Sequence, residues 1–76
     1  GASPLKALQA GELQRRLAAC LGRLPAPFRA ILALRDVEEA PYEGIAKTLG
    51  IALGTVRSRL ARARLALRQC VSGDTA

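Results

Sequence analysis

Apolar residues between positions 13 and 24 recur at steps of three and four, which is the spacing of one face of an α-helix. They are Leu13, Leu17, Cys20, Leu21 and Leu24. Gly22, Pro25 and Pro27 predict the end of this helix. A second helix is predicted from about Pro25 to Leu34, because proline is tolerated in a first helical turn. Its buried side is expected to hold Phe28, Ile31, Leu32, Leu34 and Val37.

Two further helices are predicted in the second half of the chain. Pro41 disfavours helix at the residue before it, so a connection is expected there. A third helix then runs from Pro41 to about Leu49, and Gly50 is expected to end it in a left-handed conformation. The fourth begins near Leu53, so about three residues separate the two helices. A turn that short predicts a steep crossing, as in a helix-turn-helix motif.

The composition favours an all-α fold. Half of the 76 residues are apolar, yet the chain has one Phe, one Tyr and no Trp, so the core must be mostly aliphatic. Alanine and leucine are strong helix formers. We predict a compact four-helix domain, within a range of three to five helices, over residues 11–71. Residues 1–10 are expected to be a vector-derived remnant and a linker, and residues 72–76 a frayed tail.

The chain has a formal net charge of +6, and one long stretch of its second half carries cations without any acid. No acid lies between Gly44 and Gly73, where the cations are Lys47, Arg57, Arg59, Arg62, Arg64 and Arg68. Such an excess indicates a polyanionic partner, either a nucleic acid or an anionic membrane surface. No apolar run is long enough to span a membrane.

A helical wheel of the fourth helix, at about 100° per residue, separates two faces. The apolar stripe consists of Val56, Leu60, Ala63, Leu67, Cys70 and Val71. The exposed side near the helix start consists of Gly54, Thr55, Ser58, Ala61 and Arg62. Small residues allow close approach to base edges, which arginine and serine can read in a DNA major groove. The flanking arginines could reach phosphates, or they could merely solubilise the helix and cover apolar surface. They are Arg57, Arg64 and Arg68 on one flank and Arg59 on the other.

The segment from Leu24 to Arg68, and above all "GTVRSRLARAR", resembles region 4 of bacterial sigma factors, most closely the extracytoplasmic-function group. The resemblance implies a winged-helix-like fold without the wing. It implies binding to the promoter −35 element in double-stranded DNA, docking on the β flap of RNA polymerase core, and control by an anti-sigma factor. It also implies that DNA bases are contacted by Thr55, Arg57, Ser58 and Arg62. Contacts to the DNA backbone are expected from Arg35, Tyr42, Glu43, Lys47, Arg59 and Arg64. The recognition helix would include Leu53, Gly54, Val56, Leu60 and Ala61.

Some residues depart from this family pattern. Pro41 stands where a capping Ser is usual, and Gly44 where a Glu is usual; both are expected to weaken the third helix. At Ala61 some relatives carry a base-contacting aromatic residue, so the sequence preference is expected to differ. Region 2 of a sigma factor is not in this chain, and we therefore expect an excised domain.

Two alternative functions remain open. The domain could be a protein-interaction module that docks on the β flap or an anti-sigma factor and binds DNA weakly by itself. It could also be the DNA-binding domain of a response regulator, although "TVK.H" is typical there. Leu65 points away from the apolar stripe and could belong to a partner surface.

The remaining candidate chemistry is sparse. Cys20 and Cys70 both fall on apolar stripes and are expected to be small buried hydrophobes. A redox switch between them requires that the first and last helices touch. The chain has no histidine and no triad for nucleophilic catalysis. We expect no enzyme activity, cofactor, metal, membrane or small-molecule substrate, and a location in the bacterial cytoplasm.

Overall fold

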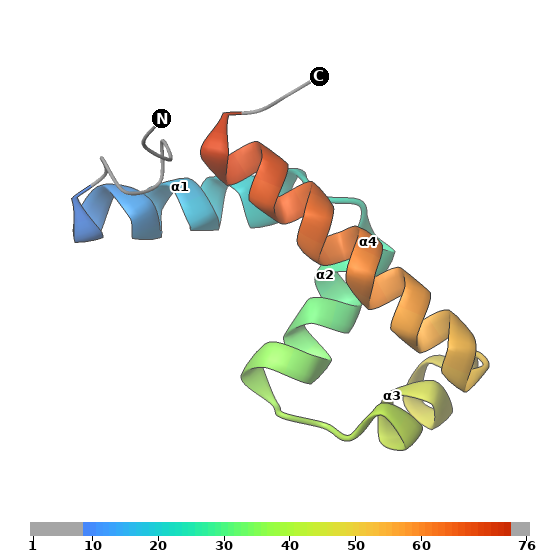
Figure 1. Cartoon of the computed structure of the whole chain (residues 1–76). Coiled ribbons are helices and arrows are strands. Elements are labelled where there is room, and N and C mark those ends of the chain that lie inside the picture. Colours follow the sequence, from blue (N-terminus) through green and yellow to red (C-terminus); the bar gives the residue numbers. More distant parts are fainter. Residues whose placement is uncertain (1–8, 74–76) are drawn as a thin grey trace.

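The computed structural model describes residues 9–73, which form four α-helices and one π-helical turn and contain no strand (Figure 1). The elements are α1 (Ala10–Arg23), α2 (Ala26–Leu32), η2 (Ala33–Val37), α3 (Tyr42–Leu49) and α4 (Leu53–Ser72). The predicted all-α fold is confirmed. Most of the predicted N-terminal remnant and the last three residues of the predicted tail lie outside the described residues.

Prolines, rather than glycine, set the boundary between α1 and α2. Leu24 precedes Pro25 and adopts an extended conformation with ψ 148°, as expected of a residue before proline. The prediction that Gly22 ends the first helix is wrong, because Gly22 lies inside α1. A single glycine costs a helix only about 1 kcal/mol, whereas the proline restricts the backbone directly.

The second helix ends differently from the prediction. After Leu32 the chain continues as η2, in which the Glu38 N–H donates to the Ala33 carbonyl at 3.1 Å. This i to i+5 bonding takes the following side chains out of the α-helical register. Val37, predicted to be buried, is instead 79% exposed. Leu34 stays half-buried against the core, as its predicted position requires.

The turn between α3 and α4 has the predicted length and stop signal. Gly50 ends α3 with φ 67°, the left-handed conformation that favours glycine. The N–H groups of Gly50 and Ile51 both donate to the Ala46 carbonyl. Pro41 is the N-cap of α3, so the helix begins at Tyr42, one residue later than predicted, and no side chain caps it.

The core lies where α2 and α3 pack on one side of α4. Its buried members are Leu24, Ile31, Leu32, Ile45, Val56, Leu60 and Ala63. The apolar stripe of α4 is therefore confirmed, although its members Leu67 and Cys70 are only half-buried. In Figure 1, α3 lies beside the N-terminal end of α4 and α1 lies beside its C-terminal end. One long helix thus connects two regions of the molecule.

Candidate nucleic-acid interface

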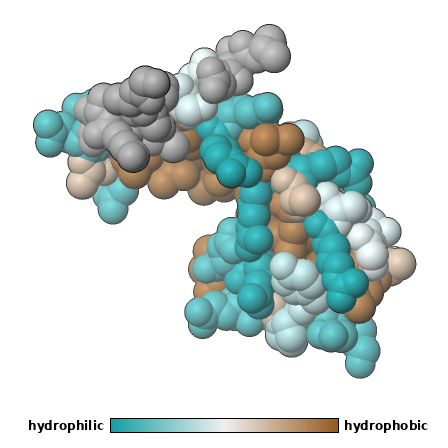
Figure 2. Space-filling view, viewed as in Figure 1, coloured by the Kyte–Doolittle hydropathy of each residue, from teal (hydrophilic) through white to brown (hydrophobic). Residues whose placement is uncertain are grey.

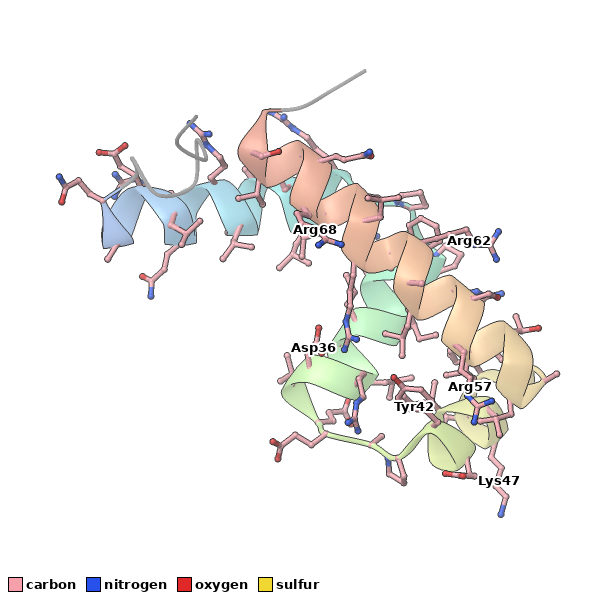
Figure 3. The ribbon with its side chains drawn as sticks, in the orientation of Figure 1. Asp36, Tyr42, Lys47, Arg57, Arg62 and Arg68 are labelled. Carbon is pink, nitrogen blue, oxygen red and sulfur yellow. A yellow bond between two sulfur atoms is a disulfide. The ribbon has the colours of Figure 1, made fainter. Side chains whose placement is uncertain are left out.

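The first turns of α4 present the side chains that sequence reasoning assigned to base contacts. Arg57, Ser58 and Arg62 are exposed, and Thr55 is half-buried. The Ser58 hydroxyl donates to the Thr55 carbonyl at 3.3 Å, and Arg62 Nε donates to the Ser58 carbonyl at 3.4 Å. These local bonds hold polar groups along one face of the helix. In Figure 3, Arg62 projects from α4 on the side opposite Arg68.

Small residues on this face of α4 leave the helix backbone accessible. Gly54 and Ala61 are both exposed. A Cβ atom added to Gly54 would meet no atom within 4 Å, so open space surrounds its backbone. The absence of bulk at these positions leaves the helix able to approach another surface closely. Whether that surface is the floor of a DNA groove stays a prediction.

The residues assigned to the DNA backbone come from three elements, η2, α3 and α4. Lys47 is exposed on α3 and Arg59 is half-buried on α4, as is Tyr42 at the start of α3. Lys47 and Arg57 project from the same end of the molecule in Figure 3. Glu43 is exposed in the first turn of α3, where a carboxylate suits the helix dipole.

Arg35 has an intramolecular role that sequence reasoning missed. Its guanidinium donates from Nη1 to the Ala40 carbonyl at 3.1 Å and lies 5.3 Å from the centre of the Tyr42 ring. A guanidinium at this distance over an aromatic face makes a favourable cation–π contact. Through these two contacts, Arg35 stabilises the connection between η2 and α3. Its expected approach to the DNA backbone stays a prediction.

Arg64 is engaged by an acid from a distant part of the chain. Its Nη2 lies 2.9 Å from Asp36 Oδ1, and this hydrogen-bonded ion pair raises the pKa of Arg64 above its ordinary value. The two side chains are 45% and 50% exposed, so the pair contributes only about 0.2–1 kcal/mol. The pair turns Arg64 towards η2. A phosphate would have to replace Asp36 as its partner.

The two cysteines are joined rather than free. Cys20 of α1 and Cys70 of α4 form a disulfide with a Cα–Cα distance of 5.8 Å. The prediction of two unbonded buried hydrophobes is therefore wrong, while the contact between first and last helices, on which a redox role depended, is present. No sequence signal beyond the shared apolar register pointed to this pairing.

Mostly apolar side chains line a crevice beside η2. A crevice of about 330 Å³ lies between α1, α2, η2 and α4, with Leu21, Leu32 and Leu67 among its walls. Leu65 is 48% exposed, as its position on the wheel predicts. Figure 2 shows apolar side chains gathered along the underside of α1. These surfaces provide a second kind of candidate contact.

Other candidate chemistry is limited within residues 9–73. No group of three or more His, Cys, Asp or Glu residues there could hold a metal ion. None of the helices in this part of the chain combines the length and the apolar character that crossing a bilayer requires.

Comparison with known sequences points to one family. The sequence model of the family "Sigma-70, region 4" matches residues 14–67. The ECF RNA polymerase sigma factor SigE of Mycolicibacterium smegmatis is 54% identical over 52 residues, which cover 68% of this chain and 20% of the relative. The RNA polymerase sigma-H factor of Pseudomonas aeruginosa is 38% identical over 65 residues, or 86% and 34% of the two chains. The ECF RNA polymerase sigma-E factor of Haemophilus influenzae is 36% identical over 62 residues, or 82% and 33%.

The chain thus spans between a fifth and about a third of the length of these curated relatives. No solved structure matches it. The matched residues include the whole of α2 and α3 and most of α4.

Proposed function

Since the chain belongs to the sigma-70 region 4 family, we propose that it binds the −35 element of promoters in double-stranded DNA and so helps a sigma factor direct RNA polymerase to those promoters. This family consists of transcription factors without enzymatic activity. The observation that carries the proposal is the exposed, acid-free face of α4, where Ser58 and Arg62 lie one turn apart beside Gly54 and Ala61.

The chemistry of that face suits a groove-reading helix. Arg62 can donate two hydrogen bonds to a guanine edge, and Ser58 can bond to several bases. Thr55 and Arg57 would complete the base contacts at the start of the helix. Lys47 and Arg59 would neutralise phosphates on either side, while Arg35, Tyr42 and Glu43 would face the backbone near the start of α3. Arg64 would join them on exchanging Asp36 for a phosphate.

Protein partners belong to the same proposal. The curated relatives are named as RNA polymerase sigma factors, and we infer docking on the β flap of RNA polymerase core, with control by an anti-sigma factor. A domain that mainly binds proteins is the second candidate function. The apolar crevice beside Leu67 and the exposed side chain of Leu65 favour it.

A salt titration separates the two functions. A duplex is first selected from a random pool with the domain, and its affinity is then measured by fluorescence anisotropy at increasing salt. Binding through several phosphates should weaken steeply with salt, because each neutralised phosphate releases counterions. If the affinity for the duplex is instead weak and insensitive to salt, the result would favour the protein-binding function.

Three arginine-to-alanine variants of α4 test the residue roles. Arg62→Ala should reduce discrimination between the selected duplex and a scrambled one by about 1–3 kcal/mol, or roughly 5- to 150-fold. Arg59→Ala should preserve discrimination and lower the salt slope by about 1. Arg68→Ala is the matched control for discrimination, since it removes the same charge from the side of α4 opposite Arg62 in Figure 3. It should preserve discrimination and mainly lower the salt slope. If Arg62→Ala retains the preference of the parent domain, the groove assignment is wrong.

A further inference from the structure

The disulfide lies outside the core that supports the recognition residues. Cys20 and Cys70 are separated by 50 positions in the sequence, and neither belongs to the buried cluster of Ile45, Val56 and Leu60. Along α4, Cys70 is eight residues beyond Arg62, or about 12 Å at the helical rise. The bond therefore fastens one end of α4 to α1 at a distance from the candidate interface.

Before Cys20, α1 meets α4 through a hydrogen bond and an open apolar crevice. Arg16 Nη1 donates to the Val71 carbonyl at 3.1 Å. Leu13 and Leu17 face α4 across an open crevice of about 380 Å³, whose opposite wall is formed by Arg64, Leu67, Arg68 and Val71. An open apolar crevice lacks the dispersion contacts that close packing would supply. Among the contacts within residues 9–73, the disulfide is therefore the strongest link between this part of α1 and α4.

The C-terminal end of α1 makes separate contacts with the core and with α2. Leu24 is buried in the core and Leu21 packs against it. Arg29 of α2 donates to the Leu24 carbonyl at 2.6 Å. These contacts do not involve the disulfide. If the disulfide were reduced, these contacts would keep this end of α1 attached while its first part moved.

We propose that the Cys20–Cys70 disulfide is a redox-controlled latch, which holds α1 against α4 when oxidised and releases residues 11–19 when reduced. The recognition half, α3 and the first turns of α4, keeps its structure in both states because its core does not include the bond. The reductant is a dithiol. Cys20 is only 2% exposed whereas Cys70 is half-buried, so the attack falls on Cys70 Sγ.

The reduction balances as a thiol–disulfide exchange. A thiolate of the dithiol attacks Cys70 Sγ and forms a mixed disulfide, and the S–S bond to Cys20 breaks with the electron pair leaving on Cys20 Sγ. The second thiol of the reductant then displaces Cys70. The reductant becomes a cyclic or intramolecular disulfide, and two protons end on the thiols of Cys20 and Cys70.

The first test is whether the folded domain can be reduced. Incubation with dithiothreitol in native buffer, followed by alkylation and mass spectrometry, should label both cysteines. Labelling only after a denaturant is added would overturn the latch, because the bond would then be inaccessible in the folded state.

The second test measures backbone order in both states by ¹⁵N NMR relaxation. On reduction, order parameters of residues 11–19 should fall from about 0.85 to below about 0.6, while those of α3 and residues 53–62 stay near 0.85. Unchanged order in α1 would overturn the proposal. So would a simultaneous loss of order in all helices, since the bond would then support the whole domain rather than α1.

Two variants complete the design. A Cys20→Ala/Cys70→Ala double variant should show a disordered first part of α1 without reductant and no response to dithiothreitol. Arg16→Ala leaves the disulfide in place and removes the hydrogen bond that joins α1 to the Val71 carbonyl. Its oxidised form should keep α1 ordered. If residues 11–19 of this oxidised variant are disordered, the hydrogen bond rather than the disulfide holds α1 in place, and the latch is overturned.

Discussion

Gly44 is a weak point in α3 whose repair should stabilise the domain. Helix α3 has only eight residues and no side-chain cap, and Gly44 is its third residue. Glycine in a helix interior is unfavourable relative to alanine by roughly 0.5–1 kcal/mol, because it loses more backbone entropy on folding. Gly44→Ala should therefore raise the free energy of unfolding.

The magnitude depends on the space available for the added methyl group. A Cβ at Gly44 would lie 3.5 Å from Cγ and 3.6 Å from Cδ of Pro41, which is ordinary van der Waals contact. No steric cost offsets the entropic gain, so the full 0.5–1 kcal/mol or so is expected. For a domain of this size, that gain corresponds to a rise in Tm of about 2–8 °C.

The assay is thermal and urea unfolding of the oxidised domain, followed by far-UV circular dichroism. Gly50→Ala is the matched control, since it makes the same substitution six residues later. Its φ of +67° is strained for alanine, which should cost about 1–2 kcal/mol. Opposite signs for the two variants are expected. A Gly44→Ala variant no more stable than the parent would refute the view that helix propensity limits α3.

Two further substitutions test the core and the ion pair. Ile45 is fully buried, so Ile45→Ala should lower the free energy of unfolding by about 2–5 kcal/mol and Ile45→Val by only about 0.5–1.5 kcal/mol, as measured by urea denaturation. Equal losses would contradict a cavity mechanism. Asp36→Asn frees Arg64 from an exposed ion pair and should cost less than about 1 kcal/mol in stability. Anisotropy with the selected duplex should show tighter binding at low salt, and unchanged affinity would argue against a phosphate contact by Arg64.

Periodicity and helix-breaking residues were sufficient to predict most of the fold. The buried stripe through Val56, Leu60 and Ala63 follows from the helical repeat, and Gly50 occupies the left-handed stop that its position predicts. Both are local properties of the chain. The hydrogen bond from Glu38 to Ala33 was not predicted, because no residue pattern distinguishes a π turn from the end of an α-helix.

The candidate site was predicted only in part, because some of its contacts join distant residues. The exposure of Ser58 and Arg62 follows from the helical wheel of α4. The Arg64–Asp36 pair spans 28 positions and depends on how α4 packs beside η2. The Cys20–Cys70 bond spans 50 positions and depends on how α1 meets α4. A single sequence gives no signal for such pairings unless a spacing rule applies.

The division of α4 into a buried stripe and an exposed face has a consequence for engineering. Ser58 and Arg62 contribute nothing to the buried core, whereas Leu60 between them is almost fully buried. Libraries that vary the exposed positions can therefore explore new binding preferences at little risk to folding.

The three-residue turn between α3 and α4 restricts the exchange of whole helices between relatives. A connection this short fixes how α3 and α4 cross. A recognition helix taken from a relative must therefore be exchanged together with the helix that precedes it.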